Sequence, residues 1–235
     1  MSEIAAVILA AGLSRRMGQP KMALPWGDTT VIGQVVRVLA EVGARPLVVV
    51  TGGARELVGA ALVAALGEAS KRAATRASMR AATRASMRAA TRAAPTMTTV
   101  FNPDFANGEM LASLQVGIRA LPDSVEACLV ALGDQPQIEV GVVKTILETY
   151  LQTGGTLWAP SFHMRRGHPW LIQRALWPDL LSMTSPATVR DFLNRHSAAI
   201  QYVAVDRDSI LQDLDTPEDY DQWTGKQKPG RDAGD

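Results

Sequence analysis

Runs of consecutive apolar residues alternate along this chain with segments in which apolar residues recur at helical spacing. The continuous runs at 4–10, 46–51 and 127–132 are typical of strands that are buried on both faces of a sheet. Residues 31–42 show helical spacing, which stops before Gly43, a common residue at a helix end. We expect shorter strands at 98–101, 157–160, 170–172 and 200–205, and further helices at 54–66, 110–121, 140–151, 186–195 (with Ser185 as the N-cap) and 217–223.

This order of strands and helices predicts an α/β fold with a mostly parallel sheet that is covered by helices on both faces. In such sheets, ligands bind beyond the carboxyl ends of the strands. We expect a single domain over residues 1–223 and a flexible tail over 224–235.

A tandem repeat with an eight-residue period, RAATRASM, fills residues 72–92. An eight-residue period does not keep one face of a helix aligned, and this unit offers only Ala and Met as apolar side chains. We therefore expect residues 67–95 to be an inserted surface segment, either disordered or loosely helical. The functional alternative is an arginine-rich arm that binds anions or nucleic acid.

Composition and charge exclude several classes of protein. With 47% hydrophobic and 20% charged residues, the chain of 235 residues is globular, and its one cysteine excludes a disulfide framework. No apolar run has the roughly 20 residues of a membrane helix, and no secretory signal is recognisable, so we expect a cytoplasmic protein. Residues 71–92 hold seven basic and no acidic residues; the remaining 17 basic and 23 acidic residues give a net charge of −6, which makes nucleic acid an unexpected partner.

The segment after the first predicted strand, LAAGLSRRMGQPK, combines small residues with cations. It matches neither the G-x-G-x-x-G fingerprint nor the P-loop. Residues 10–12 are small enough for backbone N–H groups to approach a ligand, and Arg15, Arg16 and Lys21 follow closely. Such a loop favours an anion, for which a triphosphate is the obvious candidate, whereas a surface turn with solvated arginines is the alternative.

Two aspartates follow predicted strands. Asp134 comes directly after the buried run at 127–132, where a carboxylate can hold Mg²⁺ at nucleotide phosphates; a turn-forming residue before Gln-Pro is the alternative. Asp215 offers a second carboxylate, although Asp215 or Thr216 could instead cap the following helix. Asp213 is close in sequence and could be confused with Asp215, but the Asp-Thr-Pro context favours Asp215.

Several of these segments resemble one protein family. LAAGLSRRMGQPK is similar to the signature of the MobA-like nucleotidyltransferases, and within them most like the molybdenum cofactor cytidylyltransferases. The resemblance spans residues 4–223 outside the insert. The other matching segments occur in the family's order: NPDFANGEMLASLQVG at 102–117, LGDQP at 132–136, GHP at 167–169 and DLDTPEDY at 213–220.

The resemblance implies a three-layer, Rossmann-like nucleotidyltransferase fold and a Mg²⁺-dependent reaction. A phosphate oxygen of the acceptor would attack the α-phosphorus of a nucleoside triphosphate, and pyrophosphate would leave. Mg²⁺ would bind between Asp134 and Asp215, Lys21 would lie near the α-phosphate, and Arg16 would hold the β- and γ-phosphates. The acceptor phosphate is already ionised at pH 7, so catalysis needs positioning and charge neutralisation and no general base.

The same resemblance implies the nucleotide. In the family a Leu-Ala-Ala-Gly loop goes with cytidine, so CTP is the expected nucleotide, although another nucleoside triphosphate is not excluded. Ser113 is expected to help select the base, unless it is an ordinary exposed helix residue. The loop residues that would bind the nucleotide are Leu9, Ala10, Ala11 and Gly12.

Gly167 and Pro169 suggest that His168 lies in an exposed turn, where a loop histidine with no role is the alternative. The resemblance also implies molybdopterin as the acceptor, with His168 and Arg190 as the residues that contact it. Arg165 and Arg166 are nearby cations. The segment TSPATVR at 184–190 keeps only the arginine of the Gly-Asp-x-Gly-x-Arg motif that many family members carry. The alternatives are another phosphorylated acceptor, such as a sugar phosphate, and a cofactor-binding delivery protein. A molybdoenzyme or its maturation chaperone is the expected protein partner.

Overall fold

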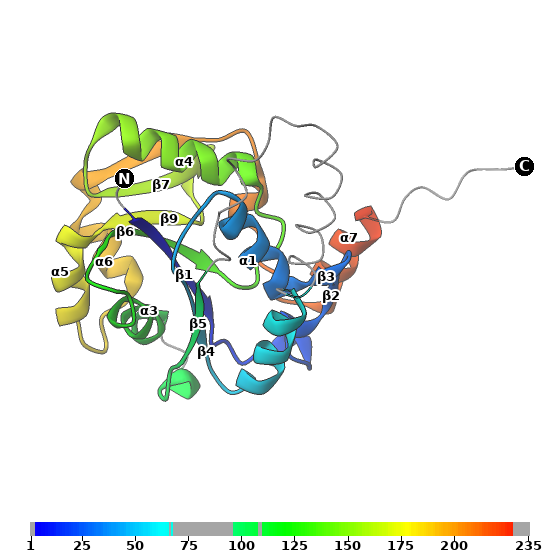
Figure 1. Cartoon of the computed structure of the whole chain (residues 1–235). Helices are drawn as coiled ribbons and strands as arrows, with labels where there is room; N and C mark the ends of the chain where they lie inside the picture. The colour runs from blue at the N-terminus through cyan, green and yellow to red at the C-terminus, as the bar shows by residue number, and fades with distance from the viewer. Residues whose placement is uncertain (1–2, 66, 68–95, 108–109, 228–235) are drawn as a thin grey trace, which may run out of the picture.

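The computed structural model describes residues 3–65, 67, 96–107 and 110–227 (Figure 1). Apart from residue 67, the insert predicted at 67–95 lies outside the described residues, so its predicted disorder or helicity stays a prediction. Most of the predicted tail also lies outside them. Its first residues, however, continue the last helix to Gln227, beyond the predicted end at 223.

The strands form one large sheet and one small hairpin. The order in the large sheet is β10-β7-β9-β6-β1-β4-β5, with β8 paired to β7, and β2 pairs with β3 in the hairpin. The strands are β1 (Glu3–Ala10), β2 (Pro25–Trp26), β3 (Thr29–Thr30), β4 (Leu47–Thr51), β5 (Met97–Phe101), β6 (Val125–Leu132), β7 (Leu157–Phe162), β8 (Arg165–Arg166), β9 (Trp170–Gln173) and β10 (Ile200–Ala204).

The large sheet is mostly parallel, as the sequence predicts. β1 pairs in parallel with β4 and β6, β4 with β5, and β10 with β7. Only β8 and β9 run antiparallel to their neighbours among the described strands of this sheet. The carboxyl ends of β1, β6 and β7 therefore lie along one edge, together with the beginning of β9.

Helices connect the strands, and most of the short 3₁₀ turns follow the carboxyl ends of strands. Residues 55–65 are also helical. The helices are α1 (Val31–Glu41), α3 (Met110–Arg119), α4 (Val140–Thr153), α5 (Trp177–Ser182), α6 (Val189–Arg195) and α7 (Pro217–Gln227); the 3₁₀ turns are η1 (Arg15–Met17), η2 (Lys21–Ala23), η3 (Phe105–Asn107), η4 (Arg174–Leu176), η5 (Ser197–Ala199) and η6 (Asp208–Leu211).

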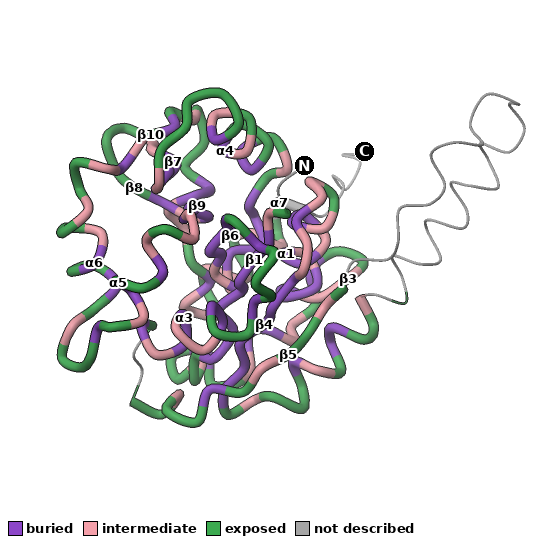
Figure 2. Tube along the Cα trace, turned by 60° about the vertical axis from the view of Figure 1, so that its left-hand side comes forward, coloured by how far each residue is buried: buried purple, intermediate pink, exposed green. Residues whose placement is uncertain are grey.

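The helices cover both faces of the sheet and build two cores (Figure 1). One face packs Ile8 and its neighbours against α1, α4 and the helix at 55–65, and the other packs Val7 and its neighbours against α3, α5 and α6. Because alternate residues of β1 enter opposite cores, its sequence is apolar throughout. Figure 2 shows buried residues concentrated along β1, β4 and β6. No helix among the described residues is long and apolar enough to cross a membrane.

One helix begins later than the sequence predicts. The segment expected to be helical from 186 with Ser185 as its N-cap becomes helical only at Val189. Thr188 is the N-cap: its hydroxyl accepts from the Asp191 N–H (3.2 Å), and the Asp191 carboxylate accepts from the Thr188 N–H (2.8 Å). This reciprocal pair satisfies two backbone donors that a serine cap at 185 would leave for other partners.

Candidate active site

A cavity of about 510 Å³ opens at the carboxyl ends of β1 and β6. This is the edge where a mostly parallel sheet binds its ligands. Its walls come from the loop after β1, from η2 and η3, from the start of α3, and from two acidic segments. The described lining residues are Leu9, Ala11, Gly12, Leu13, Ser14, Arg15, Arg16, Lys21, Met22, Phe105, Ala106, Asn107, Met110, Ser113, Leu132, Asp134, Asp213 and Asp215.

The loop after β1 is held in a compact turn around this cavity. Ser14 adopts a left-handed conformation (φ 50°), and its hydroxyl accepts from the Lys21 N–H (3.2 Å). A Cβ on Gly52 would lie only 2.4 Å from the Ala11 carbonyl, so the loop can lie this close to the end of β4 only because residue 52 is glycine. Of the predicted loop residues, Leu9, Ala11 and Gly12 line the cavity and Ala10, the last residue of β1, does not.

Lys21 lies between the two predicted carboxylates. Its Nζ is 2.7 Å from Asp134 Oδ2 and 3.0 Å from Asp215 Oδ1, and its side chain is only 8% exposed. Burial disfavours the charged ammonium, but the two carboxylates outweigh that cost, so the pKa of Lys21 is raised. The side chain is therefore a fixed positive charge at neutral pH.

Arg16 completes this ionic cluster from the outside. Its guanidinium lies 3.0 Å from Asp215 Oδ2, so Asp215 contacts Lys21 with one oxygen and Arg16 with the other. The Arg16 side chain is 72% exposed, which leaves most of its donors free for an anionic ligand. The structure thus brings together four residues that the sequence places up to about two hundred positions apart: Arg16, Lys21, Asp134 and Asp215.

The side chains of Asp213, Asp215 and Thr216, although close in sequence, have different contacts in the structure. The helix cap is Thr216, whose hydroxyl accepts from the Asp219 N–H (3.2 Å), and this frees the Asp215 carboxylate for Lys21 and Arg16. Asp213 accepts instead from Gln135 Nε2 (2.7 Å). Desolvation, and then the negative charge of Asp134, raise the pKa of Asp213.

Ser113 is a buried residue of the cavity wall and not an exposed helix residue. Its hydroxyl oxygen accepts from Asn102 Nδ2 (2.9 Å), and the side-chain Oδ1 of Asn102 accepts from the Asp104 backbone N–H (3.0 Å). Because Asn102 supplies the donor in this bond, the Ser113 hydroxyl hydrogen is not used in it. The wall therefore places a hydroxyl group at the cavity.

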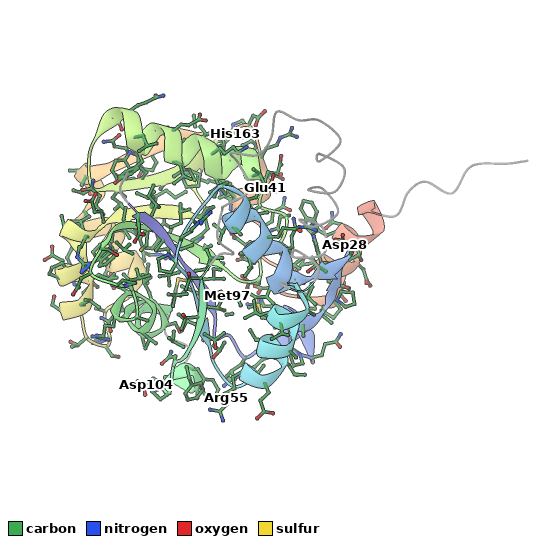
Figure 3. All side chains as sticks on the ribbon, viewed as in Figure 1. Asp28, Glu41, Arg55, Met97, Asp104 and His163 are labelled. Atoms are coloured by element: carbon green, nitrogen blue, oxygen red, sulfur yellow. The ribbon has the colours of Figure 1, made fainter. Side chains whose placement is uncertain are left out.

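Sequence reasoning missed the apolar part of the cavity. Leu13, Phe105 and Met110 line it beside Ser113, and Leu13 and Met110 are partly exposed. Phe105 packs against Phe101 at the end of β5 (ring centroids 5.9 Å apart), and Arg55 lies over the Phe101 ring. Arg55 is labelled at this end of the molecule in Figure 3. Partly exposed apolar residues in a loop carry no periodic signal, so only the fold reveals this wall.

His168 and Arg190 are not among the described residues that line the cavity. The prediction that His168 lies in an exposed turn is wrong. His168 is half-buried: its backbone N–H donates to the Ile210 carbonyl (3.0 Å), Gly167 packs tightly against Ile210, and desolvation of the imidazole lowers its pKa to about 4. It is therefore neutral at pH 7. Arg190 is exposed on α6.

The residues before β9 nevertheless share the sheet edge with the cavity. β9 runs antiparallel to β6, so its beginning lies at the carboxyl end of β6. The turn between β7 and β8 is farther along the same edge: His163, in this turn, lies far from Asp104 and Arg55 at the other end (Figure 3). The same edge of the sheet therefore extends beyond the cavity toward β7 and β8.

The donor set fits a hard divalent cation. Among the described residues, no three His, Cys, Asp or Glu side chains gather into a complete metal site. Asp134 and Asp215 each place a carboxylate oxygen within 3.0 Å of the Lys21 ammonium, so the two carboxylates lie close together. Mg²⁺ commonly takes one or two protein carboxylates and completes its shell with substrate phosphates and water. These two residues therefore suit Mg²⁺ in the presence of a nucleotide better than a metal held by protein alone.

The sheet topology, the cation-bearing loop and the paired carboxylates together define an α/β nucleotidyltransferase. A MobA-like NTP transferase domain matches residues 6–200, and the chain belongs to this family of enzymes. It is 27% identical over 221 residues to the molybdenum cofactor cytidylyltransferase of Escherichia coli (strain K12), covering 94% of this chain and 95% of that protein. The family resemblance read from the sequence is confirmed.

Solved structures share the fold. The crystal structure of Rv0371c from Mycobacterium tuberculosis H37Rv matches with a TM-score of 0.71 and 25% identity, covering 94% of this chain and 97% of that one. The structure of Rv0371c in complex with manganese matches with a TM-score of 0.67 and 23% identity, again over 94% and 97% of the two chains. The predicted α/β nucleotidyltransferase fold is confirmed.

Proposed function

We propose that this protein is a Mg²⁺-dependent cytidylyltransferase that transfers CMP from CTP to the phosphate of molybdopterin and releases pyrophosphate. The observation that carries the proposal is the position of Lys21 between Asp134 and Asp215, beside the loop after β1. The choice of CTP and molybdopterin is supported by the name of the Escherichia coli relative. The manganese complex of Rv0371c supports a divalent metal in this fold.

The reaction brings two anions together, and the charged residues of the cavity would reduce the repulsion between them. An oxygen of the acceptor phosphate forms a bond to the α-phosphorus of CTP while the bond to pyrophosphate breaks, and no proton has to move. Lys21 would hold an α-phosphate oxygen, and Arg16 the β- and γ-phosphates. Asp134 and Asp215 would hold Mg²⁺, whose charge offsets that of the phosphates.

The base would lie in the part of the cavity that is partly apolar. Leu13, Phe105 and Met110 can cover the faces of a pyrimidine, and the Ser113 O–H can donate to one of its acceptor atoms. The methyl group of Ala11 narrows this cavity and disfavours a purine. These features support CTP over GTP.

The acceptor would approach along the edge next to the nucleotide. His168 would act there as a neutral hydrogen-bonding group, because its lowered pKa keeps it uncharged at pH 7. The exposed cations Arg165 and Arg166, and more remotely Arg190, would attract the acceptor's phosphate. The product would then pass, in the cytoplasm, to a molybdoenzyme or its maturation chaperone.

A pyrophosphate-release screen tests the proposal. Purified protein with Mg²⁺ is given each of the four nucleoside triphosphates in combination with molybdopterin, a sugar phosphate and a polyol phosphate. We expect release with CTP and molybdopterin, and its loss in Asp134→Asn. Asp123→Asn, an exposed aspartate in an ion pair with Arg174 away from the cavity, is the matched control and keeps the activity.

The other outcomes identify the alternatives. Release with a sugar phosphate and not with molybdopterin would replace the proposed acceptor and keep the class of reaction. No release with any pair would refute the proposal. If cofactor delivery to a molybdoenzyme survived Asp134→Ala in that case, the protein would be a delivery protein.

A further inference from the structure

Asp134 and Asp215 belong to segments that are far apart in the chain, and side chains next to them hold these segments together. Residues 135 and 137 come from the turn after β6, and residues 212–214 come from the segment between η6 and α7. Three hydrogen bonds join the two segments: Leu214 N–H to the Asp134 carbonyl (3.1 Å), Gln135 Nε2 to Asp213 Oδ1 (2.7 Å), and Gln137 Nε2 to the Gln212 carbonyl.

Both glutamines are almost completely buried, at 2% exposed for Gln135 and 8% for Gln137. Their Oε1 atoms have no hydrogen-bond partner among the described residues. A buried amide oxygen without a partner is costly, and an apolar side chain would avoid that cost. Both amides use an N–H donor to bond the opposite segment, so their contribution lies in the geometry that these donors impose.

The side chains of residues 213–215 alternate between the cavity and the core. Leu214 is fully buried with Trp26 and Val31. Asp213 and Asp215, one residue to either side, both line the cavity. In an extended segment, residues two positions apart point to the same side, so the position of Asp213 constrains that of Asp215. The bond from Gln135 to Asp213 therefore joins the segment that carries Asp215 to the turn that carries Asp134.

We propose that Gln135 is a positioning residue which, by donating to Asp213, sets the distance between the Asp134 and Asp215 carboxylates. Asp213 acts in this arrangement as a hydrogen-bond acceptor and not as a third metal ligand. Gln137 supports the same contact from the neighbouring turn. The inference rests on the proposed function, in which the Asp134 and Asp215 carboxylates hold the metal at the nucleotide.

Three variants separate positioning from ligation. Gln135→Leu removes the donor at similar size, Asp213→Ala removes the acceptor, and Asp213→Asn keeps an acceptor oxygen but removes the charge. Binding of Mn²⁺ is measured from the electron paramagnetic resonance signal of the free ion, with CTP present and without the acceptor. The kcat and the KM for CTP are then measured with the acceptor. Gln115→Leu is the matched control. Gln115 Nε2 also donates two partly buried hydrogen bonds, to the Leu180 and Met183 carbonyls (2.8 Å each), and it does not line the cavity.

We expect Gln135→Leu and Asp213→Ala to weaken CTP-dependent Mn²⁺ binding and to lower kcat by about 10–100-fold, with a smaller change in KM. Asp213→Asn should stay within about threefold of wild type, and Gln115→Leu should bind Mn²⁺ normally even if it melts earlier. A normal near-ultraviolet circular dichroism spectrum shows that each variant is folded.

Wild-type Mn²⁺ binding by Gln135→Leu would overturn the proposal, and so would an Asp213→Asn variant as defective as Asp213→Ala, since Asp213 would then be a ligand itself. Metal binding that follows the expected order without any turnover would refute the proposed reaction alone. Wild-type protein that binds no Mn²⁺ with CTP would refute both.

Discussion

Replacing Lys21 by methionine removes the one charge that two carboxylates share, and its cost can be worked from the structure. Breaking a fully buried ion pair by removing one partner costs about 3–5 kcal/mol. The Asp134 and Asp215 side chains are 19% and 34% exposed, and Arg16 still contacts Asp215, so solvent and Arg16 offset part of this cost. We expect Lys21→Met to lower the free energy of unfolding by about 2 kcal/mol.

Urea unfolding, followed by circular dichroism, measures this loss in the absence of divalent ions. Mg²⁺ with CTP should restore part of the stability of the variant, because both bind where the positive charge was removed. With the acceptor present, kcat should fall by about 10²–10³-fold, since one charged donor to the reacting phosphate is lost. Lys144→Met, on the exposed side of α4, is the control and should change neither quantity. A Lys21→Met protein with wild-type stability and activity would refute the assignment of Lys21 to this cluster.

Three further predictions concern the rest of the cavity and its edge. His168 has a folded pKa of about 4 against an ordinary 6.5, so the folded state binds its proton less readily, and stability should fall as the pH drops from about 6.5 to 4. His168→Gln should flatten that part of the stability profile by about 1–3 kcal/mol, measured by urea unfolding at each pH. Ser113→Ala should raise KM for CTP about tenfold and, by leaving the Asn102 amide unpaired, cost about 1–3 kcal/mol of stability; unchanged values in both assays would exclude the donor role. Arg16→Ala should raise KM for CTP about tenfold with a small change in kcat, and a loss confined to kcat would contradict its assignment to ground-state phosphate binding.

The class of fold could be predicted from the sequence because burial on both faces leaves a direct mark on it. β1, β4 and β6 are apolar at nearly every position, and only strands covered by helices on both faces need that composition. The order of the motifs along the chain identified the family, which the domain match confirms. The roles of Lys21, Asp134 and Asp215 in catalysis stay predictions, although the structure brings the three side chains into contact.

The errors occur where tertiary contacts overrule local signals. Gly-His-Pro has the composition of an exposed turn, yet the packing of Gly167 against Ile210 leaves His168 half-buried. Ser185 before Pro186 resembles a helix start, yet Thr188 can bond reciprocally with Asp191, and the helix begins there. Neither contact partner is indicated by the residues that immediately surround the motif.

The sequence determined the type of each major element, the edge of the sheet at which the proposed site lies, and the kinds of side chain available there. The sequence favoured Asp215 over Asp213 as the second carboxylate, but it did not show how either side chain would be oriented relative to Lys21. The tertiary structure decided this, because burial of Leu214 and the cap at Thr216 orient the segment, while Gln135, from the turn after β6, holds Asp213. Local sequence determines the conformation of each element through its hydrophobic pattern and its local hydrogen bonds. The orientation of a side chain, in contrast, depends on partners that are distant in sequence and become neighbours only in the folded structure.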